Sequence, residues 1–245
     1  MKQAHSLFIS DLHLCESRPE ITRSFICFLQ NTAYLDEALY ILGDFFEYWV
    51  GDDDLSNPLH LDIIRALRQV SDSGTKLFIM HGNRDFLISG QFCIATGATL
   101  LSDPVLIDLY GNPTLLSHGD ALCTDDDAYQ TFRNEVRTEA WSKKFLSQPI
   151  DERHELVRQL RQESEVAKSE KSAAIMDVNH LAVEQLFRDF DYPPTLIHGH
   201  THQRALHHLM IDCHAVTRIV LGDWYDQGSY LRVDASGIMA YNLES

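Results

Sequence analysis

Short apolar runs alternate along the chain with longer segments in which apolar residues recur every three or four positions. Residues 19–31 and 58–73 have this helical period, and Pro19 and Pro58 stand where a helix would begin. The short runs show no polar alternation, which is typical of strands buried on both faces. The alternation of strand and helix predicts an α/β layered core. The predicted strands are residues 7–9, 39–42, 77–80, 115–116 and 196–197.

Two later parts of the chain have other patterns. Beyond His202 short apolar runs are separated by Gly and Asp, which predicts a second sheet that completes a sandwich. Residues 128–175 predict helix throughout. We therefore expect one domain over residues 1–245, interrupted by a helical cap at residues 125–175. The predicted late strands are residues 206–211, 216–222, 229–233 and 237–242.

Composition narrows the class of protein. The 245 residues carry 20 Lys and Arg against 36 Asp and Glu, a net charge of −16, so we expect no nucleic acid partner. Five scattered cysteines without a C-x-x-C pair argue against a disulfide scaffold or a thiolate zinc site and favour a reducing compartment. The sequence has no signal-peptide pattern and no apolar stretch of ~20 residues. We expect a cytoplasmic chain that can still lie on a membrane surface.

Polar groups follow five of the predicted strands. Taken singly, each is ordinary turn chemistry or a histidine bonded to backbone. Together they supply carboxylates, imidazoles and an amide oxygen, and the carboxyl ends of strands in open α/β sheets are where ligands bind. His198, His200 and His202 alternate, so all three would project on one side of an extended segment. The groups are Asp11-x-His13, Gly43-Asp44, Gly82-Asn83-Arg84-Asp85, His118-Gly119-Asp120 and Gly199-His200-Thr201-His202.

This order of motifs resembles the calcineurin-like metallophosphoesterase superfamily, from Asp11 to His202. The resemblance implies a four-layer αββα sandwich. The longer stretches HGNRDF, LSHGDALCTDDDAYQ, KSAAIMDVN and LIHGHTH resemble, more narrowly, the family of UDP-2,3-diacylglucosamine hydrolases of lipid A synthesis.

The resemblance implies two divalent metal ions per chain, expected to be Mn²⁺. Asp11, His13 and His202 would bind the first metal. Asn83, His118 and His200 would bind the second, and Asp44 would bridge the two. Two cations that share a carboxylate polarise phosphoryl oxygens and lower the pKa of a bridging water, so that hydroxide can attack in line. Asp85 and Asp120 would orient the histidines.

Arg84 is a departure from many superfamily members, which have His at this position. Arginine stays protonated and cannot act as a general acid, but a leaving phosphate with a second pKa of ~6 needs no proton at pH 7. Arg84 therefore favours cleavage of a pyrophosphate bond, with its guanidinium clamping phosphate oxygens. A plain surface arginine is the alternative. We expect Asp44, Arg84 and His200 to be the catalytic residues.

The narrower resemblance also implies substrate contacts. Ser164 and Lys171 in the cap would reach the head group. Lys168 stands where related sequences have Asn. Without the resemblance, Ser164, Lys168 and Lys171 would be interpreted as the solvated face of a helix. An apolar stripe from Phe132 to Leu146 would line an acyl-chain slot or dip into the membrane, the alternative being simple core. The full set of expected contacts is Asn83, Arg84, Asp126, Ser164, Lys168, Lys171 and His200.

The expected activity is hydrolysis of UDP-2,3-diacylglucosamine to UMP and 2,3-diacylglucosamine 1-phosphate, with attack at the α-phosphorus. The expected partners are this nucleotide-linked glycolipid and, peripherally, the cytoplasmic face of a bacterial inner membrane; no obligate protein partner is evident. One alternative is a metallophosphoesterase acting on a soluble nucleotide pyrophosphate or phosphodiester. Another is a non-catalytic scaffold, which the seven filled ligand positions disfavour.

Overall fold

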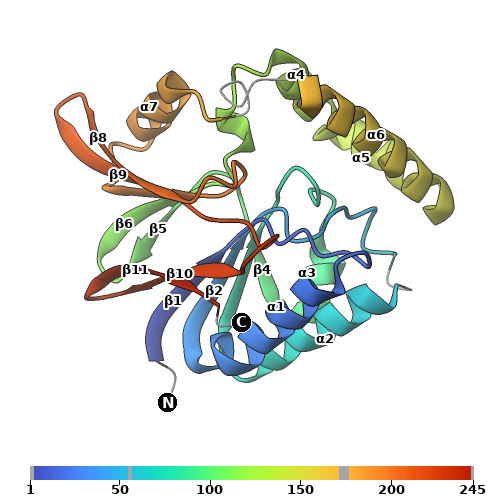
Figure 1. The fold of residues 1–245 in the computed structure, drawn as a ribbon, viewed down its shortest axis with the longest axis horizontal. Coiled ribbons are helices and arrows are strands. Elements are labelled where there is room, and N and C mark those ends of the chain that lie inside the picture. Colours follow the sequence, from blue (N-terminus) through green and yellow to red (C-terminus); the bar gives the residue numbers. More distant parts are fainter. Residues whose placement is uncertain (1–2, 55–56, 171–176, 244–245) are drawn as a thin grey trace.

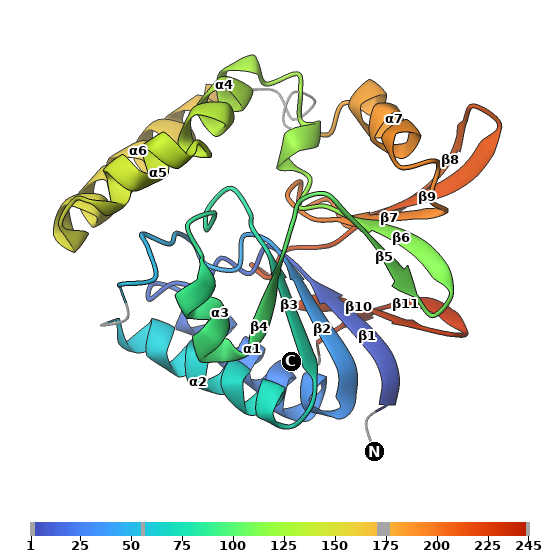
Figure 2. The same cartoon turned by 180° about the vertical axis from the view of Figure 1, so that it is seen from behind.

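The computed structural model describes residues 3–54, 57–170 and 177–243, with the side chains of the long helix α6 described as far as Gln162. Two β-sheets lie face to face, and helices cover the outer face of each (Figures 1 and 2). Further helices at residues 127–136, 139–146 and 150–170 lie beyond one edge of the sandwich (Figure 1), where Phe145 and Trp141 pack against the core beneath the first sheet. No helix in the described part of the chain is long and apolar enough to cross a membrane.

The first sheet has the strand order β11-β10-β1-β2-β3-β4 among the described residues. Strands β1 to β4 run parallel, whereas β10 pairs antiparallel with β1 and with β11. The carboxyl ends of the parallel strands therefore meet at one edge of the sheet. The strands are β1 (Gln3–Ile9), β2 (Asp36–Leu42), β3 (Lys76–Met80), β4 (Ala98–Leu101), β10 (Ser229–Asp234) and β11 (Gly237–Asn242).

The second sheet has the order β5-β6-β7-β9-β8. Its central pairs, β6 with β7 and β7 with β9, are parallel, while β5 and β8 pair antiparallel at the two edges. The strands are β5 (Val105–Leu109), β6 (Asn112–Leu116), β7 (Thr195–His198), β8 (Ala205–Ile211) and β9 (His214–Val220).

Helices divide between the layers and the group beyond this edge. α1, α2 and α3 cover the first sheet, and α7 covers the second. Local signals fix several ends: Asn57 caps α2 by accepting the backbone N–H of Leu59, and Asn179 caps α7 in the same way. The helices are α1 (Pro19–Asn31), α2 (Pro58–Asp72), α3 (Gly90–Thr96), α4 (Asp127–Val136), α5 (Glu139–Leu146), α6 (Ile150–Glu170) and α7 (His180–Asp189).

Three apolar clusters fill the three spaces between the four layers. One face of β1 to β3 packs on α1 and α2 through residues such as Leu7 and Phe25. The opposite face, with Phe8 in its middle, packs on the second sheet. The far side of the second sheet packs on α7 through Phe187. Alternate residues of β1 thus enter different cores, which is why this strand has no polar alternation.

The predicted four-layer αββα fold is confirmed, and two details of the prediction are wrong. The strands after His202 do not all complete the second sheet, because β10 and β11 extend the first sheet instead. The segment 128–175 is not one continuous helix. It breaks after Val136 and again after Leu146, where Thr138 caps α5 and Pro149 stands just before α6. Residues 171–175 of that segment lie outside the described residues.

Candidate metal centre

Five strands deliver the predicted ligand residues to the gap between the carboxyl edges of the two sheets. The loops after β1, β2 and β3 carry the residues from the first sheet, and those after β6 and β7 carry the residues from the second. Backbone hydrogen bonds tie the loops together: the amide of Asp11 donates to Gly43 O at 3.1 Å, and that of Gly199 donates to His118 O at 2.9 Å. Residues that are distant in sequence therefore form one rim.

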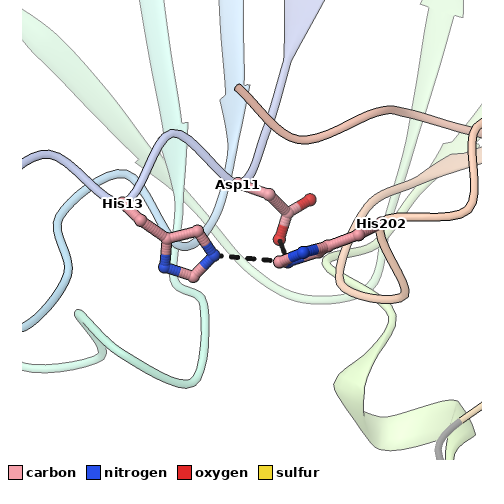
Figure 3. A group of neighbouring side chains, drawn as sticks. All are labelled: Asp11, His13 and His202. Carbon is pink, nitrogen blue, oxygen red and sulfur yellow. Dashed lines mark hydrogen bonds and ion pairs between the residues drawn. The ribbon is translucent and has the colours of Figure 1, made fainter. Parts of the chain in front are cut away.

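Asp11, His13 and His202 form the first group of possible ligands (Figure 3). The Nε2 atoms of the two histidines lie 3.2 Å apart, and Asp11 Oδ1 lies 3.4 Å from His202 Nε2. The other ring nitrogen of His202 lies 3.3 Å from the carboxylate of Asp223, which sets the orientation of the ring. Asp11 and His13 are fully buried, and His202 is partly exposed.

Asp44, His118 and His200 form the second group. His118 Nδ1 bonds to Leu42 O at 2.9 Å, which directs Nε2 toward Asn83 Oδ1 at 3.1 Å. The carboxylate of Asp44 faces both groups: its Oδ1 lies 3.6 Å from His118 Nε2 and its Oδ2 lies 3.8 Å from His13 Nε2. The structure thus brings together all seven predicted ligand residues, with Asp44 in the middle.

The backbone at this rim is held in an uncommon conformation. Asp11, His13, Asp44, His200 and His202 all have φ between 48° and 69°, the left-handed region that non-glycine residues rarely occupy. Such strain persists only where the surroundings over-determine the backbone, and it gathers at functional sites. Five of the seven predicted ligands share it.

Two glycines allow the loops to approach one another. A Cβ at Gly82 would lie 2.2 Å from Asp44 Oδ1, and a Cβ at Gly199 would lie 2.4 Å from Asp11 Oδ2. Neither carboxylate could keep its place beside a larger residue. The glycines of the motifs thus make room for the acidic side chains.

The donor set fits a pair of divalent cations. Asp11 Oδ1 is buried and, among the described residues, has only the 3.4 Å approach of His202 Nε2, whereas its other oxygen accepts from Ser10 Oγ at 2.6 Å and from the amide of His200 at 2.9 Å. Burial raises the pKa of Asp44 to about 7, against the attraction of His118. Burial alone would lower the pKa of His118, but Asp44, Asp120 and Asp11 outweigh it and raise that pKa to about 9. Convergent carboxylates and imidazoles of this kind are stabilised by bound cations.

Asp85 and Asp120, expected to orient the histidines, also hold loops in place. Asp85 is fully buried and accepts the backbone N–H groups of Gly82 and Phe45 at 2.8 and 2.7 Å. Asp120 accepts from Tyr129 Oη at 2.7 Å and pairs with Arg133 and Arg137 of the α4 segment. Asp120 therefore fastens α4 to the rim.

Glu47 was not predicted as a site residue, yet its buried carboxylate joins three arginines. It pairs with Arg18, lies 2.8 Å from Arg161 on α6, and lies 3.9 Å from Arg84. It also lies 3.8 Å from the Nδ1 atom of His13. The available signal was an acidic residue inside the apolar stretch FFEYW, where an unpaired carboxylate would be costly to bury.

His198 does not join the other two histidines of its motif. It ends β7 with its side chain buried, its Nδ1 bonded to Gly199 O and its Nε2 lying 3.0 Å from Arg218. Burial, and then the charge of Arg218, lowers its pKa to about 4. The expectation that the three histidines project together is wrong because the chain leaves the extended conformation at His200, where φ is positive.

Two cavities adjoin the rim. The first, of about 300 Å³, lies between helices α4 to α6 and the loop after β3, and aromatic and aliphatic side chains line most of it. The second, of about 550 Å³, extends past the loop after β1 and is lined mainly by polar groups. Glu47, Tyr48, Arg84 and Arg161 line both cavities.

The predicted substrate contacts divide into three sets. Asn83, Arg84 and His200 lie at the rim, and the first two line the apolar cavity. Asp126 caps α4 by accepting the N–H of Tyr129 at 3.1 Å, which is a structural use of that carboxylate. Lys171 lies outside the described residues, and so do the side chains of Ser164 and Lys168.

Comparison with known proteins agrees with this arrangement. Residues 5–204 match the family model of the calcineurin-like phosphoesterases. The UDP-2,3-diacylglucosamine hydrolase of Aromatoleum aromaticum is 51% identical over 95% of this chain and 94% of its own, and that of Pseudomonas aeruginosa is 51% identical over 94% and 95%. The structure of an archaeal phosphodiesterase covers 98% of this chain and 99% of its own with a TM-score of 0.50 at 12% identity, a likeness of fold. The chain therefore belongs to the calcineurin-like phosphoesterases and, within them, to the family of the UDP-2,3-diacylglucosamine hydrolases.

Proposed function

We propose that this chain hydrolyses UDP-2,3-diacylglucosamine to UMP and 2,3-diacylglucosamine 1-phosphate. The observation that carries the proposal is the place of the two ligand groups, which Asp44 faces from the middle and which adjoin an apolar cavity of about 300 Å³. A soluble nucleotide has no acyl chain that could fill such an apolar cavity. The names of relatives about 50% identical to this chain give the substrate independently.

Two Mn²⁺ ions are the proposed cofactors. Asp11, His13 and His202 would hold one, Asn83, His118 and His200 would hold the other, and Asp44 would touch both. Oxygen and nitrogen donors without sulfur suit Mn²⁺, and the family implies divalent metals. Bound there, the ions would supply Lewis-acid polarisation of the phosphoryl oxygens and a water of lowered pKa.

The residues of the chain position the pyrophosphate and balance its charge. The backbone N–H of Arg84 donates to Asp44 Oδ1 at 2.9 Å, so the loop after β3 is bonded directly to the central carboxylate. The guanidinium of Arg84 stays protonated and can donate to the departing phosphate, which leaves as an anion without needing a proton. Asn83 and His200 adjoin the same point. We place the attack of water at the α-phosphorus, next to uridine.

The apolar cavity is the proposed site for an acyl chain. Phe86, Phe132, Trp141 and Phe145 contribute to its wall. Each buried CH₂ group of an acyl chain adds ~0.8 kcal/mol, so burying only part of a chain contributes strongly to binding. Phe132 lines the cavity and has an exposed fraction of 38%, so an acyl chain in contact with it would also reach the surface. The cap residues Ser164, Lys168 and Lys171, together with Asp126, stay proposed contacts of the head group.

We further propose that the protein binds peripherally to the cytoplasmic face of the inner membrane. The exposed side chains of Phe132 on α4 and Leu146 on α5, together with Lys143 and Lys144 in the last turn of α5, support this. Apolar and basic groups on one set of helices are typical of interfacial binding. The substrate itself would partition into that surface.

Hydrolysis in H₂¹⁸O tests the activity. Purified protein with Mn²⁺ and UDP-2,3-diacylglucosamine should release UMP carrying one ¹⁸O, and both EDTA and Asp44→Ala should abolish this product in mass spectra. Label in the lipid phosphate would keep the reaction and move the attack to the β-phosphorus. If the protein binds metal but does not turn over UDP-2,3-diacylglucosamine, the proposed lipid substrate is wrong, and a soluble nucleotide pyrophosphate becomes the favoured substrate.

A further inference from the structure

The polar cavity next to the rim has no role in the function proposed above. It extends away from the apolar cavity, toward the segment Leu14–Arg18 that follows the predicted ligand His13. Tyr225, which stacks on His13 with ring centroids 5.2 Å apart, forms part of its wall. The cavity therefore begins beside the first ligand group.

Its charge is unusual for this chain. Arg18, Arg84 and Arg161 line it against only two glutamates, Glu16 and Glu47, although the whole protein carries a net charge of −16. Glu47 pairs with Arg18 and Arg161 and so fixes two of the guanidinium groups in place. A local excess of fixed guanidinium groups favours an anion with several oxygens, such as a phosphate ester.

The remaining wall suits a neutral polar group. Ser17, Tyr48 and Asn57 bring hydroxyl and amide groups to the cavity, and its volume of about 550 Å³ lies within the range of ligand pockets. An acyl chain placed here would offer no hydrogen bonds to this polar wall or to its guanidinium groups, and taking them out of water without new partners is costly. A nucleobase and a ribose offer the matching donors and acceptors.

We propose that the polar cavity binds the nucleoside monophosphate half of the substrate. This inference rests on the proposed function, because it divides that substrate between the two cavities. The wall that they share, formed by Glu47, Tyr48, Arg84 and Arg161, then lies under the pyrophosphate. The nucleoside lies on one side of the wall and the acylated sugar on the other, with the reacting phosphorus beside the two ligand groups.

Cys15 provides a direct probe, because its half-buried thiol lines the polar cavity. Protein loaded with Mn²⁺ is treated with N-ethylmaleimide, and peptide mass spectrometry follows each cysteine. UMP at ten times its Kd should slow labelling of Cys15 about tenfold, since only about a tenth of the sites stay empty. Cys27 and Cys213 are exposed elsewhere and serve as internal references whose labelling UMP should not change.

Inorganic phosphate and dodecyl phosphate are the competing probes. Protection of Cys15 by UMP but by neither competitor supports a nucleotide site. Equal protection of Cys15 by inorganic phosphate would show that the cavity binds anions without recognising a nucleoside. Protection by dodecyl phosphate would show that the cavity binds the lipid half of the substrate. Either result overturns the proposal.

A variant that fills the cavity gives a second readout. Cys15→Trp should raise KM for the substrate and the inhibition constant of UMP at least tenfold, with Mn²⁺ content and melting temperature unchanged. Cys27→Trp, on the exposed face of α1, is the matched control and should behave as the wild type. Unchanged UMP inhibition in Cys15→Trp would overturn the site.

The two proposals fail separately. If the protein turns over the lipid substrate but UMP does not protect Cys15, the proposed nucleotide site is wrong and the proposed function stands. If UMP protects Cys15 but the protein does not turn over the lipid, the proposed lipid substrate is wrong and the nucleotide site stands.

Discussion

Arg84 serves the candidate site through both its backbone and its side chain. Its N–H holds the carboxylate of Asp44, while its guanidinium lines both cavities and lies near Glu47. A substitution at position 84 changes the side chain and leaves the backbone hydrogen bond to Asp44 in place. This separation allows a test of the phosphate contact alone.

Arg84→Lys should lower kcat/KM by about 10- to 100-fold, because one charge-assisted hydrogen bond contributes ~1.5–3 kcal/mol and lysine cannot form a bidentate pair. Arg84→His should do no better, since a departing phosphate needs no general acid. Steady-state kinetics measure both variants, and metal content should stay at the wild-type value. Arg65→Lys, at an exposed position of α2, is the control. Higher kcat in Arg84→His than in Arg84→Lys would contradict the absence of acid catalysis.

Helix α6 is fastened to the core near its first turn. Arg153, with an exposed fraction of 1%, donates to Val50 O at 2.7 Å and to Asp53 Oδ1 at 2.8 Å. The neighbouring His154 lies 2.8 Å from the carboxylate of Asp54. Farther along the helix, Arg161 reaches Glu47. The wall of the apolar cavity therefore depends on polar contacts at two points of α6.

Arg153→Met should loosen this attachment. A buried carbonyl left without its donor costs ~1–3 kcal/mol, so the melting temperature should fall and amide exchange in α6 should become faster. KM for the lipid should rise more than kcat falls, because the rim residues are untouched. Arg158→Met, which removes an exposed arginine of the same helix, is the matched control. Wild-type exchange rates in α6 would show that Arg153 does not hold the helix.

Local patterns predicted the helices at residues 19–31 and 58–73 with nearly correct ends, because Pro19, Pro58 and Asn57 are strong local signals. The two breaks in the helical segment had signals too, Thr138 and Pro149, but the apolar stripe from Phe132 to Leu146 continued past the first of them. The short helices α3 and α7 and the strands β4 and β5 were not predicted, since none has a long periodic run. β10 and β11 join the first sheet because β10 pairs with β1, at the other end of the chain. A local sequence pattern carries no information on a pairing between such distant segments.

The candidate ligand residues were predictable because each belongs to a short motif at the end of a strand. Glu47 and Asp223 were not, since each acts through a neighbour: Glu47 through its arginines and Asp223 through His202. Their roles exist only in the folded chain. Family resemblance supplies the metal and substrate chemistry, and the fold supplies the partners that position it.

Both sheets of the molecule contribute residues to the candidate metal centre. Asp11, His13, Asp44 and Asn83 come from the first sheet, whereas His118, His200 and His202 come from the second. Cations bound between them would link the two sheets in addition to the apolar core. Metal binding and folding should therefore be coupled.

Removal of metal with EDTA should lower the melting temperature, and addition of Mn²⁺ should restore it. At a metal concentration of 100 times Kd the stabilisation is ~2.7 kcal/mol, which corresponds to a shift of roughly 5–10 °C for a chain of this size. Differential scanning fluorimetry measures the shift. Asp44→Asn should show a smaller one, because the central carboxylate is gone. Equal melting temperatures with and without Mn²⁺ would mean that the sheets are not linked by metal.

The left-handed backbone at the rim also limits how this family can change its ligands. Asp11 and Asp44 occupy a conformation that Gly, Asn and His adopt more readily than most residues and that β-branched side chains avoid. Evolution can therefore exchange a carboxylate for an amide at these positions more readily than for the longer carboxylate of Glu. The backbone thus restricts which donor groups positions 11 and 44 can present to a cation, apart from any demand of the chemistry.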